Sequence, residues 1–243
     1  MAGPYHWVMP RDESIQVNFS SPKPLFPLDS AVLLPQQILP LHIFEERYTQ
    51  MISHVLDGAG QFAMAVFQGE RWRKEYHGSP PIRPVACIAQ ILQHERLEDG
   101  RYNIIVQGIC RGRVVRHTRA QGDTLYRTVL LEPIGVDGDD ENELYGVRER
   151  LRELLSDGPL VQLRAGEWVL QRLNNEEIPA TALLELVSFT LMSDPEVKYR
   201  LLEEPSAGLR AEIIEGELLD MQRLIRRAQM QNTDDWPKGC SWN

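Results

Sequence analysis

The spacing of apolar residues divides the chain into two halves. Between positions 25 and 134, apolar residues form short runs bounded by proline, glycine and polar clusters, as in β-strands. From position 144 onward they recur every three or four residues, as in helices that bury one face. The pattern therefore predicts an α+β fold, in which a β-rich N-terminal subdomain precedes a C-terminal helical bundle.

One segment of the β-rich half has the periodicity of a helix. Apolar residues at three- and four-residue steps run from Phe44 to Val55, and Asp57-Gly58 then ends the helix. We expect Phe44 and Tyr48 to lie in the core. The runs predicted as strands lie at 26–28, 31–34, 36–41, 62–67, 85–93, 102–106, 108–115 and 125–131, with a hairpin turn at Glu98-Asp99-Gly100 and a bulge at Gly108.

Changes in composition predict the boundaries of the domains. Asp194-Pro195 combines a capping residue with proline at the first helical position, which predicts that a helix starts there. The predicted segments are a proline-rich mobile lead-in at 1–24, the β-rich subdomain at 25–134, an acidic linker at 135–143, the helical subdomain at 144–230 and a C-terminal tail at 231–243.

Charge and cysteine content narrow the class of protein. The formal net charge of −9 repels phosphate backbones, so we expect no nucleic-acid partner. The three cysteines match no zinc spacing, and Cys87 and Cys110 sit in apolar runs, which indicates reduced core thiols and a reducing compartment. No apolar run is long enough for a signal peptide or for a membrane helix of ~18 residues. We therefore expect a cytoplasmic protein with no membrane partner.

Motifs for catalysis and metal binding are absent from the sequence. There is no G-x-S-x-G turn, and the six histidines show no H-x-x-x-H spacing. The acidic run at 137–141 lacks the alternating order of a calcium loop. We therefore expect no cofactor, no metal and no enzymatic activity.

Three blocks of the sequence resemble the N-terminal domain family of Lon proteases. The first block combines Phe26-Pro-Leu28, Leu34-Pro35 and the run from Leu39-Pro-Leu41 to Arg47-Tyr48. The second combines the strands at 84–91 and 102–111 around their turn, with Ala86 and Cys87 where the family often has glycine and threonine. A third, looser block covers 194–219, so that the resemblance extends over residues 24–228.

The resemblance implies both a fold and a role. The fold would be a β-rich pseudo-barrel joined to a helical bundle. The role would be non-catalytic binding of polypeptide segments or unfolded proteins, as an adaptor that serves a protease and its substrates or as a holdase-like binder. No G-x-x-x-x-G-K-[ST] loop occurs, so we expect the domain to act without an ATPase of its own. The sequence leaves the oligomeric state open.

The loop from Gln68 to Pro84 is the candidate binding region. It places Trp72 and Tyr76 among charged residues, and Trp, Tyr and Arg are enriched at binding hot spots. We predict that Trp72 and Tyr76 border a peptide-binding groove, with the alternative that Trp72 folds back on the sheet. Arg47 either lines the same surface or pairs with a carboxylate and braces the inserted helix.

Two other classes of function stay open at this point. A hydrolase or transferase would have its site at the junction of the two subdomains, marked by a polar cluster with shifted pKa values. A structural homo-oligomerisation module would show a large, self-complementary apolar interface.

Overall fold

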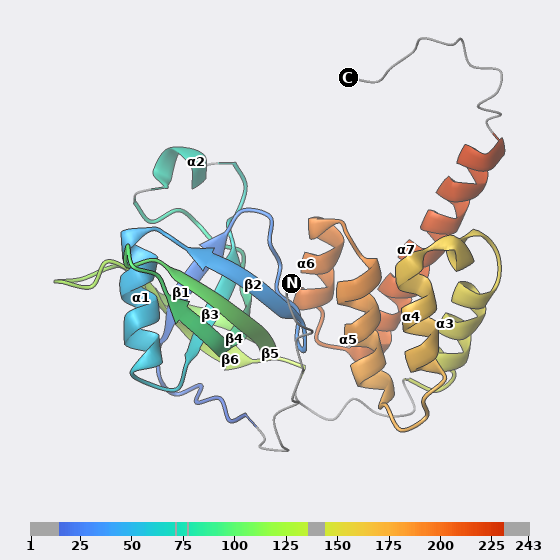
Figure 1. Cartoon of the computed structure of the whole chain (residues 1–243), viewed down its shortest axis with the longest axis horizontal. Helices are drawn as coiled ribbons and strands as arrows, with labels where there is room; N and C mark the ends of the chain where they lie inside the picture. The colour runs from blue at the N-terminus through green and yellow to red at the C-terminus, as the bar shows by residue number, and fades with distance from the viewer. Residues whose placement is uncertain (1–14, 71, 77, 136–143, 231–243) are drawn as a thin grey trace, which may run out of the picture.

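The computed structural model describes residues 15–70, 72–76, 78–135 and 144–230 of the 243-residue chain. The first part of the predicted lead-in, all but one residue of the predicted linker, and the whole predicted tail lie outside the described residues. Strands occupy the N-terminal part, which we call the β lobe, and helices occupy residues from 147 onward, which we call the helical lobe. The helical lobe lies on one side of the sheet and α1 on the opposite side (Figure 1).

In the part of the chain that the structure describes, six strands form one sheet that closes on itself. They are β1 (Lys23–Leu28), β2 (Ile38–Ile43), β3 (Gln61–Val66), β4 (Val85–Arg96), β5 (Tyr102–Thr118) and β6 (Thr128–Pro133), in the order β2-β5-β4-β3-β1-β6. Because β6 pairs with both β1 and β5, every strand except β2 belongs to a closed ring. This is the β-rich pseudo-barrel that the resemblance implied.

The long hairpin of β4 and β5 contains the most extensive strand pairing of this sheet. Its turn is the predicted one, with Gly100 in the left-handed region at φ 85°. The two runs predicted on either side of Gly108 form one continuous strand, β5, with a register shift between Ile88 and Ala89. The bulged residue is Ile109, one position after the predicted bulge.

One predicted strand is absent from the structure, and another begins later than predicted. Residues 31–34 form no strand, although Val32, Leu33 and Leu34 are almost fully buried. Their apolar character reflects a loop that inserts into the core. Strand β6 begins at Thr128 instead of Leu125, because Gln50 on α1 bonds the Asp123 carbonyl and the Leu125 amide and holds that stretch as a loop.

Helix α1 (Glu46–Leu56) is the predicted inserted helix, but it begins after Phe44. Tyr48 is buried with the rest of the apolar face, whereas Phe44 is 64% exposed. The backbone of Glu45 is extended, so Phe44 precedes the helix and does not share its buried face. The expectation that Phe44 lies in the core is therefore wrong.

Besides α1, the β lobe has a one-turn helix, α2 (Trp72–Glu75), in the loop between β3 and β4. The helices from residue 147 onward form the bundle. It contains α3 (Val147–Ser156), the 3₁₀ turn η1 (Pro159–Gln162), α4 (Arg164–Leu173), α5 (Ala180–Leu191), α6 (Pro195–Glu203) and α7 (Ala207–Met230). As predicted, Asp194 caps α6, where its side chain accepts the Glu196 amide at 2.8 Å. None of the helices described is long and apolar enough to span a bilayer.

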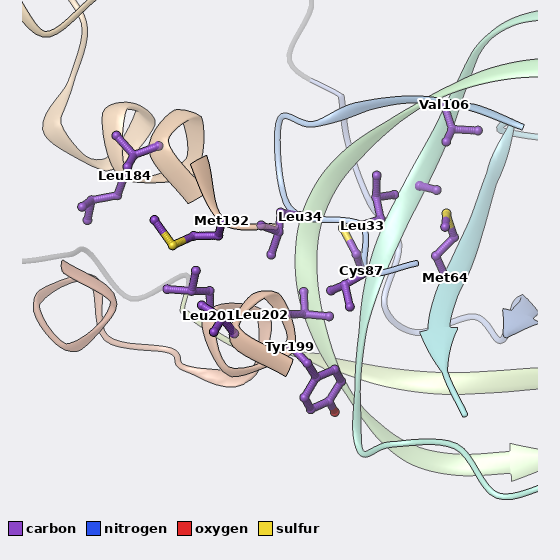
Figure 2. Packing of buried hydrophobic residues seen from close by; sticks show 14 of the residues in the cluster. Leu33, Leu34, Met64, Cys87, Val106, Leu184, Met192, Tyr199, Leu201 and Leu202 are labelled. Carbon is purple, nitrogen blue, oxygen red and sulfur yellow. The ribbon is translucent and has the colours of Figure 1, made fainter. Parts of the chain in front are cut away.

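One hydrophobic cluster joins the two lobes. Figure 2 shows Leu33, Leu34 and Cys87 of the β lobe meeting Met192, Leu201, Leu202 and Tyr199 of the helical lobe. The Tyr199 hydroxyl accepts the Val85 amide at 3.0 Å, which satisfies a buried donor of β4. A smaller cluster lines the ring of strands and is covered by Val17 and Phe19.

A buried ion-pair network crosses the same junction. Arg111 on β5 pairs with Glu185 on α5 at 2.9 Å, and both side chains are less than a tenth exposed. Arg210 on α7 approaches the same carboxylate at 3.6 Å. Arg111 also donates to the Leu201 carbonyl at the end of α6. The lobes are thus joined by apolar packing and by buried polar contacts.

Candidate functional site

An aromatic pocket of about 280 Å³ opens where β1 and β2 end and α1 begins. Its lining consists of Phe26, Pro27, Leu28, Asp29, Leu41, His42, Ile43, Phe44, Glu45, Tyr48, Phe67, Trp72 and Tyr76. Phe26, Tyr48 and Phe67 are buried and form the floor, whereas Phe44 stands exposed at the rim. Small-molecule sites usually span ~300–1,000 Å³, so this pocket suits a group the size of a side chain.

The aromatic rings hold each other in fixed orientations. Phe26 meets Tyr48 edge to face with ring centroids 4.6 Å apart. Trp72 stacks on Phe67 at 5.1 Å with the rings nearly parallel, and Tyr76 contacts both rings by its edge. Trp72 therefore does fold back on the end of the sheet, and in doing so it becomes one wall of the pocket.

The loop that carries α2 is tied down at its base. The Gln68 amide donates to the Pro81 carbonyl at 2.9 Å, and the Arg83 amide donates to the Val66 carbonyl at 2.8 Å. Phe67 and Ile82 form an isolated antiparallel bridge. These bonds close the loop like a short hairpin, so its tip presents Trp72 and Tyr76 at a defined place beside β1.

Arg47 braces the pocket from behind. Its guanidinium lies 4.6 Å from the Tyr48 ring and 4.5 Å from the Tyr76 ring, and it donates to the Tyr76 carbonyl at 3.0 Å. It also pairs with Glu45 at 2.9 Å, and the Tyr76 hydroxyl donates to the same carboxylate. Burial raises the pKa of Tyr48 and of Tyr76, so both hydroxyls stay neutral at physiological pH.

The structure brings the three candidate residues together around this pocket. Trp72 and Tyr76 line it, and Arg47 stands behind Tyr76 without belonging to the lining. Phe44 is the lining residue that the sequence reasoning misplaced. The periodicity alone does not separate Phe44 from the helix, because the extended backbone of Glu45, which ends the helix before Phe44, is visible only in the structure.

A second hollow, the outer groove, adjoins the pocket across β2. Its volume is about 450 Å³, and it is lined by Pro40, Leu41, His42, Gln93, His94, Glu95, Asn103, Ile104 and Ile105. Leu41 and His42 line both hollows. His42 and Asn103 are hydrogen-bonded through their side chains at 2.8 Å, and Asn103 donates to Glu95 at 3.1 Å. The outer groove is thus more polar than the aromatic pocket.

The junction of the lobes holds a third cavity, of about 480 Å³. Its lining is polar, as a hydrolase or transferase would require. However, Arg83 donates to both carboxylate oxygens of Glu196 at 2.9 Å and lies 3.5 Å above the Tyr199 ring. Burial raises the pKa of Tyr199 to about 12. These groups pair with one another and link the β lobe to α6, and the described residues include no cluster of three metal ligands.

Most of the sequence matches a known family. The family model for the ATP-dependent protease La (LON) substrate-binding domain covers residues 23–220. Lon protease from Desulfosudis oleivorans is 25% identical over 88% of the chain, and that from Geobacter metallireducens is 25% identical over 90%. The chain spans only about a quarter of these relatives, 26% and 27% of their lengths.

Solved structures show the same fold. The N-terminal domain of the Mycobacterium avium complex Lon protease superposes with a TM-score of 0.63 at 17% identity, covering 82% of this chain and 99% of that one. A Lon N-terminal domain protein from Xanthomonas campestris gives 0.55 at 21% identity, covering 79% and 95%. At these identities the likeness concerns the fold alone.

Proposed function

The chain belongs to the LON substrate-binding domain family, and from this premise we propose that it is a non-catalytic module that binds segments of other proteins at the aromatic pocket. The observation that carries the proposal is the pocket itself, in which buried rings form the floor, the half-buried Trp72 forms one wall and Phe44 stands exposed at the rim. An apolar side chain entering it would bury aromatic surface on several sides.

The expected affinity for any one segment is low. Burying a phenylalanine or leucine side chain contributes about 1.5–3 kcal/mol. Ordering the flexible segment around it opposes binding by a similar amount. Such weak and tolerant binding suits the recognition of many unfolded polypeptides, as an adaptor or holdase-like protein requires. In this proposal Arg47 positions Tyr76 and makes no contact with the bound segment.

The test is binding of fluorescently labelled casein, which serves as an unfolded polypeptide, to variants of the pocket. We expect Trp72→Ala and Tyr76→Ala each to weaken binding by about tenfold, since aromatic anchors dominate such contacts. Trp168→Ala is the matched control. Trp168 lies on α4 in the helical lobe, where it is 40% exposed and contacts Arg172, and it does not line the pocket. Wild-type affinity of both pocket variants, with circular dichroism showing an intact fold, would refute the proposal.

A further inference from the structure

We propose that the bound segment adds to the sheet as an extended strand along the free edge of β2, with one apolar side chain in the aromatic pocket. The inference rests on the proposed function and states how the segment is held. It starts from the sheet topology. Strand β2 pairs with β5 from Ile38 to Ile43, and no other described strand pairs with its opposite edge.

The ladder determines which backbone groups face that edge. Just before β2, the Gly108 amide donates to the Gln37 carbonyl at 2.9 Å. In an antiparallel pair, hydrogen-bonded positions alternate with positions whose groups point away from the partner. Counting from Gln37, the backbone groups of Ile38, Pro40 and His42 point away from β5.

These groups match an extended polypeptide. Ile38 and His42 offer an amide and a carbonyl each, and Pro40 offers a carbonyl, at intervals of about 6.8 Å along the strand. An extended backbone repeats its own donors and acceptors at the same interval. The chemistry of this edge therefore selects another chain in strand conformation.

Pro40 favours a foreign segment over a second copy of this chain. If two β2 strands paired antiparallel with their Pro40 residues opposite each other, both donors at that position would be missing and the two rings would face each other. A segment with any other residue opposite Pro40 loses only one donor and keeps the bond to the Pro40 carbonyl. The proline thus blunts self-association and leaves most of the edge usable.

The two faces of the added strand would meet different surroundings. Side chains alternate along a strand, so every second residue of the segment would share the face of Leu41 and Ile43, which line the aromatic pocket. The residues between them would share the face of Pro40 and His42, which line the outer groove. The favoured segment therefore alternates apolar and polar residues, with a bulky apolar side chain near the end of β2.

Substitutions at Ile38 test the edge on the protein side. Ile38 lines neither hollow, and as the first residue of β2 it tolerates proline without losing a bond to β5. The probe is a synthetic peptide of alternating valine and lysine, with one central phenylalanine in place of a valine. We expect Ile38→Pro to bind it about five- to tenfold more weakly than Ile38→Ala, because only the alanine variant keeps the edge amide. Equal affinities of the two variants, with both folded, would overturn strand addition.

A scan of the peptide backbone tests the same idea from the ligand side. N-methylation at single positions should weaken binding at every second residue and have little effect between them, since only alternate amides face β2. If N-methylation weakened binding equally at all positions while Trp72→Ala still weakened it, strand addition would be overturned and the proposed function would stand. Loss of sensitivity to Trp72→Ala would overturn the proposed function itself. Dimerisation that Ile38→Pro abolishes, measured by sedimentation, would replace the peptide by a second copy.

Discussion

Gly108 on β5 lies against the loop that inserts into the core. A Cβ atom there would lie 2.1 Å from the Leu34 carbonyl oxygen and 3.1 Å from the Cys87 sulfur. The backbone of Leu34 would have to move, and such overpacking costs about 1–3 kcal/mol. We expect Gly108→Ala to lower the free energy of unfolding by about 2–3 kcal/mol in urea titrations.

Gly216 on α7 provides the control for that substitution. Nothing lies within 4 Å of a Cβ built at Gly216, and alanine is favoured over glycine in a helix by about 1 kcal/mol. Gly216→Ala should therefore stabilise the protein slightly. If Gly108→Ala were as stable as the wild type, the close approach of the Leu34 carbonyl would not be a constraint on the fold.

His117 links stability to pH. Burial, followed by the charges of Arg127 and Arg119, lowers its pKa in the folded protein. Arg127 lies 3.1 Å from His117 Nε2, and because arginine only donates, this nitrogen accepts and the ring is neutral. The unfolded chain then binds the proton more readily. Stability contributed by the neutral ring is present above the unfolded pKa of ~6.5 and is lost as the pH falls below it.

The corresponding measurement is the free energy of unfolding between about pH 5 and pH 7.5. In His117→Gln we expect a shallower decline towards low pH than in the wild type, because the substitution removes this titration. Gln121→Ala, at an exposed position after β5, should keep the wild-type slope because it removes no titrating group. An unchanged slope in His117→Gln would mean that the contact with Arg127 does not influence the titration.

At the scale of elements, the local sequence pattern predicts those helices and strands whose contacts are made by residues nearby in the sequence. The hairpin of β4 and β5 follows from two apolar runs around a turn, and α1 follows from its periodicity. Residues 31–34 show where pattern fails, because an apolar run becomes a strand only if another strand offers it an edge. That condition depends on contacts across the whole sheet, such as the parallel pairing of β1 with β3.

The candidate site was predictable only in part for the same reason. The composition of the loop singled out Trp72 and Tyr76, and the resemblance drew attention to Arg47. Their meeting in one pocket depends on the Phe67–Ile82 bridge and on the cation–π contacts of Arg47, which no local pattern encodes. The free edge of β2 is likewise a property of topology, since it exists only because the other strands close into a ring.

At the scale of the whole molecule, the shared core predicts that both lobes unfold together. Glu185 lies between Arg111 and Arg210 at the junction, and its removal leaves two buried cations without their carboxylate. Breaking such a buried pair costs about 3–5 kcal/mol. We expect Glu185→Ala to reduce hydrogen-exchange protection equally in β3 of one lobe and in α5 of the other.

Glu217→Ala is the control, because Glu217 pairs with Arg200 at 3.2 Å on the surface, where ion pairs contribute less than about 1 kcal/mol. Protection lost from α5 but retained in β3 would show that the lobes open independently, and that the common hydrophobic cluster does not couple them.

Because one hydrophobic cluster spans both lobes, we also expect them to move as a single rigid body. The last turns of α7 extend beyond α3 and α4 (Figure 1), while the start of the same helix is anchored beside the junction through Ala207, Arg210 and Ala211. A protein fused after α7 would therefore hold the aromatic pocket at a fixed distance and in a fixed orientation. A segment bound in the pocket would then keep one orientation relative to that fused protein, which a flexible linker would not ensure.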